Sequence, residues 1–420
     1  MRTRRSLLAT AGYASVALAS NAVSIAAAAA SQSNARSDKA LAKDEQYWSL
    51  IAQAFQLDGR WIILNGGGNN PHPTSVVNAL SRFESLSSSA PRPHNYVLQA
   101  RINDHRRRLA KLMGCTPAEI AITRNTTEGL NIVGWGLALD QGDEIIVSDV
   151  DDFYAGKVFE QRARRHGVIV RRIELPLSPT VAQTVRLFEE AITPRTKLIV
   201  ASHIADGWGY VLPIRELSEL AHDNGAQLLA DGALSFGQIP VNVTELGCDY
   251  YATSLHKWLN APLGTGALVV REHRLESLWP LYSTRRDAND IRKFEDIGTR
   301  SGASIAAIGQ AIDFYEHIGV ERKAARLRYL LSIIQKQLDG VAGVRFISEP
   351  DPRRRAGLAR IAVAGVSGTD LTTTLREEFG IYTWGNWPGA NDGVYVSPNV
   401  FNSESDVTAF AQAVIQIARR

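Results

Sequence analysis

The chain has 420 residues, of which 45% are hydrophobic and 21% are charged, a composition typical of a globular protein with enough length for two domains. Its formal net charge is +3. Arg2, Arg4 and Arg5 supply all of it, so the rest of the chain lacks the basic face that nucleic-acid binding requires. The sequence leaves a disulfide between Cys115 and Cys248 open, but we interpret both as structural, because buried cysteines commonly act as small apolar residues.

The first 30 residues have the features of an export signal. A basic start is followed by an alanine-rich apolar run and by small residues at positions 26–30. The pair Arg4-Arg5, followed by Ser-Leu-Leu, resembles a twin-arginine signal. An uncleaved membrane anchor is the alternative, but the run is too rich in Ala and Ser to hold a membrane well. The sequence therefore predicts a twin-arginine signal in residues 1–30, a flexible spacer in residues 31–44, export by the twin-arginine machinery and a periplasmic location.

The next segments alternate between helical and strand patterns. Residues 44–55 have the periodicity of an amphipathic helix. The apolar residues 61–64 predict a strand that leads into Asn65-Gly-Gly-Gly, a turn whose backbone can approach a ligand closely. A plain strand-to-helix turn explains these glycines equally well. Residues 98–113 again have helical periodicity, and residues 120–123 predict a strand.

A loop with the character of a phosphate site follows that strand. Arg124-Asn-Thr126-Thr127-Glu-Gly opens a helix that we expect to run to about Leu139. Free backbone N–H groups and small hydroxyls at a helix N-terminus bind a phosphate dianion. The same residues also form a good helix cap, so this pattern alone is weak.

Polar residues then follow a series of strands. Residues 142–148 predict a turn and a buried strand, and residues 197–201 predict another strand that leads to His203 and Asp206. We interpret His203 as a structural hydrogen-bonding residue. Residues 213–224 predict a helix with Pro at its first turn.

Two further strands end on an acid and a lysine. Residues 227–230 are apolar and stop at Asp231, and residues 249–253 stop at Ser254-Leu-His256-Lys257. Ligands of open α/β sheets bind at the carboxyl ends of strands. Pyridoxal phosphate (PLP) needs a lysine for its Schiff base and an acid that keeps its pyridine nitrogen protonated. Taken singly, such an acid is more often a helix cap, and such a lysine a solvated loop residue.

Together with the phosphate-type loop, these strand ends resemble a known family. Asp231-Gly-Ala, Ser254-Leu-His-Lys257-Trp-Leu and Gly264-Thr-Gly are similar to the class V aminotransferases of PLP fold type I, the group of cysteine desulfurases and isopenicillin N epimerase-like proteins. The resemblance runs from about residue 45 to the C-terminus. It implies an α/β fold with a large, doubly wound, mostly parallel sheet and a smaller C-terminal α/β domain.

The resemblance also implies an organisation into domains and subunits. Residues 45–75 would pack with the small domain, residues 76–295 would form the large PLP-binding domain, and residues 296–420 would form the small domain. The Gly298-Thr299 segment would reach the phosphate of a neighbouring subunit, which implies a homodimer with shared active sites. Residues 302–338 read as one or two long helices.

Each expected site residue takes its role from the family. Lys257 would be the catalytic residue, carrying the cofactor and then moving a proton, while Asp231 would hold the pyridinium. Phe153 would stack on the cofactor ring, with Tyr154 as the alternative. His256 would have a supporting role. The complete expected cofactor-binding set is Thr126, Thr127, Phe153, Asp206, Asp231, Ser254, His256, Lys257 and Thr299.

Three positions depart from the family pattern. Leu234 stands where relatives carry His or Gln, and Asp206 stands where many carry Asn. Tyr395 replaces an Arg that, in relatives, forms a bidentate interaction with the substrate α-carboxylate. Loss of this interaction would cost roughly 1.5–3 kcal/mol of binding free energy for the carboxylate. The substrate carboxylate is then absent or tied up in an amide, or another arginine compensates. The candidates for such compensation are Arg285, Arg286 and Arg300.

These observations predict a PLP-dependent enzyme that acts on the amino group or α-carbon of an amino acid or an amino-acid-derived substrate, with no metal. Persulfide chemistry is disfavoured, because no cysteine follows residue 300. Export and the aromatic loop 384–389 suit a bulky peptidic substrate, and a periplasmic relative tailors the siderophore pyoverdine. The alternatives are an epimerase or C–S lyase for a free amino acid, and a non-catalytic binding protein that keeps the fold.

Overall fold

The computed structural model describes residues 36–420 except 152, 350, 352 and 386–391. The predicted signal in residues 1–30 lies outside this range, as does most of the aromatic loop 384–389. Within it, no helix has the length and apolar character needed to cross a membrane.

The large domain is built on a seven-stranded sheet with the spatial order β2-β8-β7-β6-β5-β3-β4. The five strands from β4 to β7 run parallel, whereas β8 is antiparallel to both of its neighbours. This mostly parallel α/β sheet confirms the predicted fold class. The strands are β2 (Ile120–Thr123), β3 (Glu144–Ser148), β4 (Ile169–Ile173), β5 (Thr196–Ser202), β6 (Gln227–Asp231), β7 (Tyr250–Ser254) and β8 (Gly266–Val270).

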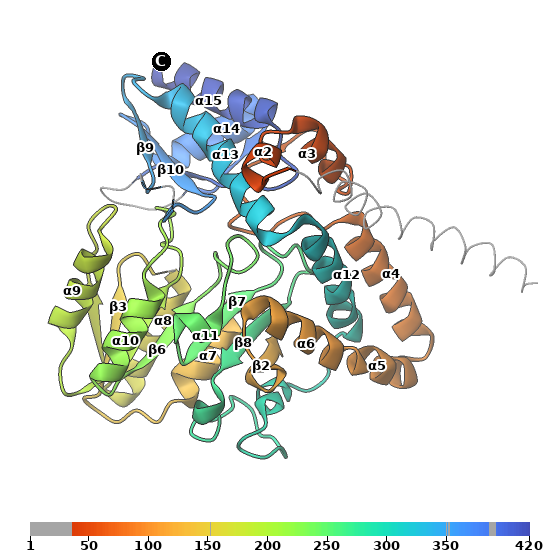
Figure 1. The fold of residues 1–420 in the computed structure, drawn as a ribbon, viewed down its shortest axis with the longest axis vertical. Coiled ribbons are helices and arrows are strands. Elements are labelled where there is room, and N and C mark those ends of the chain that lie inside the picture. Colours follow the sequence, from red (N-terminus) through yellow and green to blue (C-terminus); the bar gives the residue numbers. More distant parts are fainter. Residues whose placement is uncertain (1–35, 152, 350, 352, 386–391) are drawn as a thin grey trace, which may run out of the picture.

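Helices cover both faces of this sheet (Figure 1). The central strands are mostly apolar because successive side chains enter opposite cores. Ile145 and Val147 pack on the side of α7 and α8, whereas Ile146 packs on the side of α6, α10 and α12. The helices of this domain are α4 (Thr74–Ser89), α5 (Pro91–Ala100), α6 (Ile102–Met113), α7 (Thr126–Gly136), α8 (Phe153–His166), α9 (Val181–Ala191), α10 (Ile214–Asp223), α11 (Val243–Leu246) and α12 (Gly302–Ile318).

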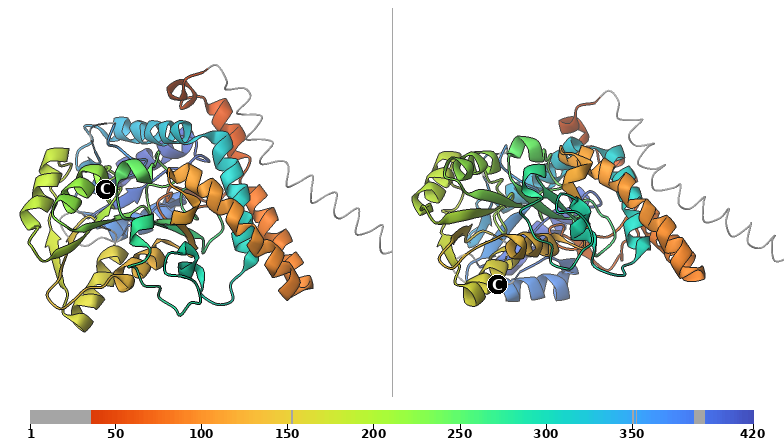
Figure 2. Two further views of the ribbon diagram at one scale, coloured as in Figure 1. Left: turned by 60° about the horizontal axis from the view of Figure 1, so that its bottom comes forward. Right: turned by 90° about the horizontal axis from the view of Figure 1, so that it is seen from below.

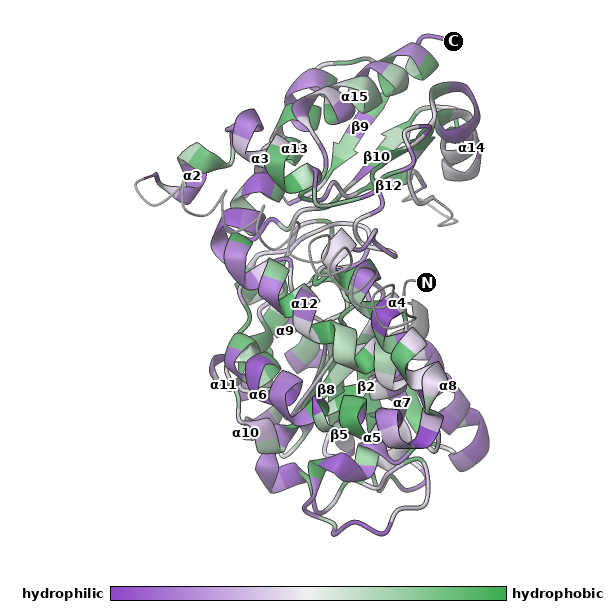
Figure 3. Cartoon of the chain, turned by 90° about the vertical axis from the view of Figure 1, so that its right-hand side faces the viewer, coloured by the Kyte–Doolittle hydropathy of each residue, from purple (hydrophilic) through white to green (hydrophobic). Residues whose placement is uncertain are grey.

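The small domain stacks an antiparallel sheet, in the order β12-β10-β9, against three helices. Figure 3 shows its hydrophobic strands lying beneath helices with hydrophilic outer faces. A two-stranded parallel sheet joins the N-terminal β1 to β11, so this strand packs with the small domain. The elements are β1 (Ile62–Ile63), α13 (Val320–Leu338), β9 (Val344–Ile347), β10 (Ala359–Val363), α14 (Gly368–Phe379), β11 (Ile381–Tyr382), β12 (Val394–Val396) and α15 (Glu404–Ala418).

Helix α12 (Gly302–Ile318) packs against helices of the large domain. Figure 2 shows α4 and α5 lying along α12 at one edge of the molecule, and Phe83 packs there against Ala303 and Ala307. Helix α12 ends at Gly319, whose φ is 83°, and α13 then enters the small domain. The packing therefore puts residues 302–318 with the large domain, because their alanine-rich face is complementary to α4.

Two other expectations change in detail. The predicted spacer 31–44 is helical in part, since α2 (Asp38–Leu41) buries Leu41, whose carbonyl accepts a hydrogen bond from the Trp48 indole at 2.8 Å. α3 (Glu45–Ala52) follows directly. The predicted helix 98–113 is split at Arg101 into α5 and α6.

Candidate active site

The ends of three neighbouring strands bring the expected acid into the site. Asp231 is the last residue of β6, and the register pairs it with Ser202 on β5 and with Ala252 on β7. Its side chain is buried, and Oδ1 accepts a hydrogen bond of 2.8 Å from the backbone N–H of Ala233. A buried carboxylate is thus fixed at the carboxyl edge of the sheet, as the sequence predicted.

Lys257 lies three residues beyond the end of β7, in a tightly held turn. Its carbonyl accepts a 3.0 Å hydrogen bond from the Asn70 amide, and the next carbonyl, of Trp258, accepts one from the ammonium of Lys323. Asn260 completes the turn with a φ of 58°, and its side chain donates to the carbonyl of Pro71 at 2.9 Å. A left-handed asparagine and two side-chain donors from other segments therefore fix the backbone that carries Lys257.

The expected phosphate residues meet at the start of α7. Ser254 Oγ lies 2.8 Å from Thr126 Oγ1 and accepts a 3.0 Å hydrogen bond from the Thr126 backbone N–H. Thr127 occupies the next position of the same first turn. A side chain on Gly266 would meet the backbone of Asn125 at 2.7 Å, so the glycine lets β8 approach this loop. Two hydroxyls at a helix N-terminus are the donor set that a phosphate requires.

His203 and His256 are both buried near the site. Burial lowers the pKa of His256, whose Nδ1 donates to the carbonyl of Thr265 at 3.0 Å. Burial also lowers the pKa of His203 to about 4, and its ring packs edge-on against Tyr251. His203 thus fits the structural role expected for it, and His256 braces the Lys257 turn.

Asp206 contacts Tyr395 of the small domain, and Arg360 lies beside that pair. The hydroxyl of Tyr395 on β12 donates a hydrogen bond to Asp206 Oδ1. Arg360 on β10 faces Tyr395 in the strand register, with its guanidinium carbon 5.7 Å from the centroid of the Tyr395 ring. A side chain on Gly207 would meet the Arg360 guanidinium at 2.1 Å, so this glycine admits the arginine. Arg360 was not expected from the sequence, in which it is a single charge inside the apolar strand 359–363.

The segment that follows β12 is linked to the Lys257 turn through Gly66 and Gly67. Ser397, on the same face two residues later, accepts a 3.0 Å hydrogen bond from the N–H of Gly67. The neighbouring Gly66 packs against the ring of Trp258. Tyr395, Arg360 and Asp206 therefore lie in the same inter-domain region as the lysine.

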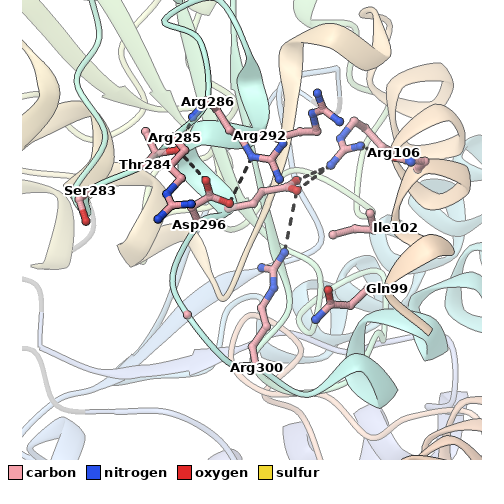
Figure 4. A pocket seen from close by; sticks show the side chains of 13 residues that line it. Gln99, Ile102, Arg106, Ser283, Thr284, Arg285, Arg286, Arg292, Asp296 and Arg300 are labelled. Carbon is pink, nitrogen blue, oxygen red and sulfur yellow. Dashed lines mark hydrogen bonds and ion pairs between the residues drawn. The ribbon is translucent and has the colours of Figure 1, made fainter. Parts of the chain in front are cut away.

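The arginines proposed as substitutes for the lost carboxylate ligand lie elsewhere. Arg285, Arg286 and Arg300 line a cavity of about 750 Å³ beside β2 (Figure 4). Arg300 donates to the carbonyl of Ile122 at 2.9 Å, and Arg286 pairs with Asp296. Arg360 is the residue that this structure brings to Tyr395.

Two further expectations concern residues at the margins of the site. Thr299 is exposed next to this cavity, and its contact with a neighbouring subunit stays a prediction. Phe153 and Tyr154 open α8, but their side chains lie outside the described part of the structure, so the choice of stacking residue also stays a prediction.

The loop that leads to α8 is anchored by an unexpected carboxylate. Asp151 accepts hydrogen bonds from the N–H groups of Ser148 at 2.5 Å and Ser202 at 2.7 Å, which joins the ends of β3 and β5. Desolvation raises the pKa of Asp151 to about 6. Nothing in the local sequence distinguishes Asp151 from its neighbours Asp149 and Asp152.

Neither cysteine has the character of a nucleophile. Both are free, Cys248 is buried and Cys115 partly so. Burial raises the pKa of both thiols to about 12, which opposes thiolate formation at neutral pH. Both therefore act as structural residues.

A buried acid, a lysine on the adjacent strand end and hydroxyls at a helix N-terminus together define a PLP enzyme of fold type I. Residues 62–385 match the family model of class V aminotransferases. The chain belongs to this family, and its cofactor is therefore pyridoxal phosphate. The donor set of Thr126 and Ser254, with the buried carboxylate of Asp231, fits that group.

Individual relatives agree with this assignment. The chain is 29% identical to an isopenicillin N epimerase of Streptomyces clavuligerus over 87% of this chain and 97% of that protein. Its fold matches a cysteine desulfurase structure from Escherichia coli with a TM-score of 0.78, 24% identity and coverage of 89% and 98%. A C-DES mutant with glycine linked to its PLP cofactor matches with a TM-score of 0.78, 23% identity and coverage of 85% and 97%. At these sequence identities, the two structures support the assignment of the fold and nothing further.

Proposed function

We propose that this PLP-dependent enzyme acts on the amino group or α-carbon of an amino acid or amino-acid-derived substrate, with Lys257 as the residue that carries the cofactor and moves the proton. The main support for this proposal is that Lys257, Asp231 and the Thr126–Ser254 pair lie at the same edge of the large sheet. When bound, the cofactor supplies the electron sink. The chain supplies a buried anion for the ring, hydroxyls for the phosphate and a firmly held lysine.

An absorbance titration tests this proposal. The purified protein with PLP should show a visible band that disappears in Lys257→Ala and persists in Lys111→Ala, which removes an exposed lysine. A panel of amino acids and peptidic metabolites should then shift the band for the accepted substrate class. A protein that stays colourless with added PLP would overturn the proposal and favour a binding protein that keeps the fold.

Epimerisation is the second candidate reaction, supported by the similarity to isopenicillin N epimerase over nearly the whole of that relative. Two assays separate it from transamination. Appearance of the opposite stereoisomer, with exchange of the α-proton in D2O and no consumption of a 2-oxo acid, indicates epimerisation, whereas stoichiometric conversion of a 2-oxo acid indicates transamination. Release of a thiol would instead indicate a C–S lyase.

We further propose twin-arginine export to the periplasm, a homodimer in which Thr299 reaches the neighbouring phosphate, and a peptidic siderophore as a substrate to include in the panel. The motif Arg4-Arg5 supports export. An Arg4→Lys/Arg5→Lys variant should stay in the cytoplasm in cell fractionation. Light scattering of the purified protein should give twice the mass of one chain if the protein is a dimer. A fully active monomer would contradict the proposed homodimer.

A further inference from the structure

The position at which the family binds a substrate carboxylate has changed its chemistry here. An arginine is replaced by Tyr395, and its hydroxyl donates a hydrogen bond to Asp206. Asp206 itself stands where relatives often carry a neutral asparagine. The charged donor arginine is thus replaced by the neutral donor Tyr395, and the neutral asparagine is replaced by the anion Asp206.

Arg360 returns a positive charge to this position from a different strand. It is 4% exposed, lies beside the Tyr395 ring and closely approaches Gly207, the neighbour of Asp206. Burial lowers the pKa of Arg360, and the charge of Asp206 is the largest influence that opposes this shift. Asp392 also opposes the shift, so the buried guanidinium lies among carboxylates rather than alone.

An arginine that lies among carboxylates recognises a different ligand from a lone arginine. A free carboxylate placed at this position would be attracted by Arg360 and repelled by Asp206, so the net gain from binding it is small. A carboxamide is uncharged and offers both a carbonyl acceptor and an N–H donor. Its carbonyl can accept from Arg360 or Tyr395, while its N–H can donate to Asp206.

We propose that Asp206, Arg360 and Tyr395 form a substrate subsite that selects compounds whose carboxyl group is a carboxamide or peptide bond over free α-amino acids. This inference rests on the proposed function and names its substrate class. β12 leads directly to Ser397, which binds the glycine turn that packs against Trp258, the residue after Lys257.

The experiment compares L-alanine, L-alaninamide and L-alanylglycine as ligands of the PLP-loaded protein, with binding constants taken from the change in the visible band. Wild type should bind the two amides at least about tenfold more tightly than the free acid. Asp206→Asn should abolish most of this preference, because it removes the repulsion of the carboxylate. Asp223→Asn, which neutralises an exposed carboxylate on α10, is the matched control and should leave the preference unchanged.

A wild-type protein that binds L-alanine as tightly as, or more tightly than, the amides overturns the inference. An unchanged preference in a folded Asp206→Asn protein does so as well, and Asp206→Ser replaces that variant if the first does not fold. Absence of a Lys257-dependent band would defeat the proposed function itself. A normal Lys257-dependent absorption band together with tighter binding of L-alanine than of the amides would contradict the proposed subsite but not the proposed function.

Discussion

The ammonium of Lys323 donates a hydrogen bond to the carbonyl of Trp258, the residue that directly follows Lys257. Lys323 is 2% exposed and lies over the rings of Trp258 and Tyr315. Among the described residues, no carboxylate forms a salt bridge with it. The first turn of α13, which leads into the small domain, is thereby tied to the turn that carries Lys257.

The buried Lys323 predicts a pH-dependent effect of Lys323→Met on stability. Burial lowers the pKa of Lys323 from 10.5 to about 7, so between these values the unfolded chain holds one more proton than the folded chain. Stability linked to this group therefore rises with pH across that window. The substitution should stabilise the protein most below pH 7, and its benefit should shrink by roughly 1.4 kcal/mol per pH unit above that.

At high pH the same substitution should become unfavourable, because the Trp258 carbonyl loses its donor at a cost of about 1–3 kcal/mol. Urea unfolding at pH 6, 8 and 9.5 measures the difference between variant and wild type. A difference that does not change with pH would show that Lys323 titrates normally in the folded protein.

Ser254→Ala should weaken cofactor binding. The hydroxyl lies between the Thr126 N–H and the Thr126 hydroxyl, and loss of a charge-assisted hydrogen bond costs about 1.5–3 kcal/mol. The dissociation constant for PLP should rise by roughly 10- to 150-fold in equilibrium dialysis. Ser277→Ala, at an exposed serine, serves as control, and equal affinities of the two variants would argue against this phosphate site.

Asp231→Asn should separate cofactor loading from turnover. Asparagine keeps an acceptor for the Ala233 N–H but removes the negative charge that holds the pyridinium. The protein should still load PLP, while α-proton exchange falls by roughly 100-fold, the value of a charge-assisted bond of about 3 kcal/mol. Exchange at the wild-type rate would assign the ring nitrogen to another partner.

Arg106→Met should destabilise the large domain. Arg106 and Glu295 form a buried ion pair at 2.7 Å, and Glu295 also accepts from the N–H of Ile122 on β2. Removing one partner of such a pair costs about 3–5 kcal/mol, because the other charge stays buried. Urea unfolding should show this loss, whereas Arg107→Met, at an exposed pair, should change stability by less than about 0.5 kcal/mol. A double variant with Glu295→Gln should lose less than the sum of the single losses.

The sequence by itself determined the elements that depend on local pattern. The apolar strands that stop at Asp231 and Ser254, and the capped helix start at Thr126, were readable because each segment's periodicity records which side chains enter a core. These are also the residues that carry the family resemblance. Helices α4, α8 and α9 were not identified, because serines or charges interrupt their apolar stripes.

Only the tertiary structure decided which distant side chains meet. Asp206 and Tyr395 are 189 residues apart, and Arg360 joins them because β10 and β12 are paired in a separate domain. Lys323 reaches Trp258, and residues 302–318 pack with the large domain, for the same reason. Local periodicity records how a segment divides between water and core, whereas contacts between segments depend on how complete surfaces fit together.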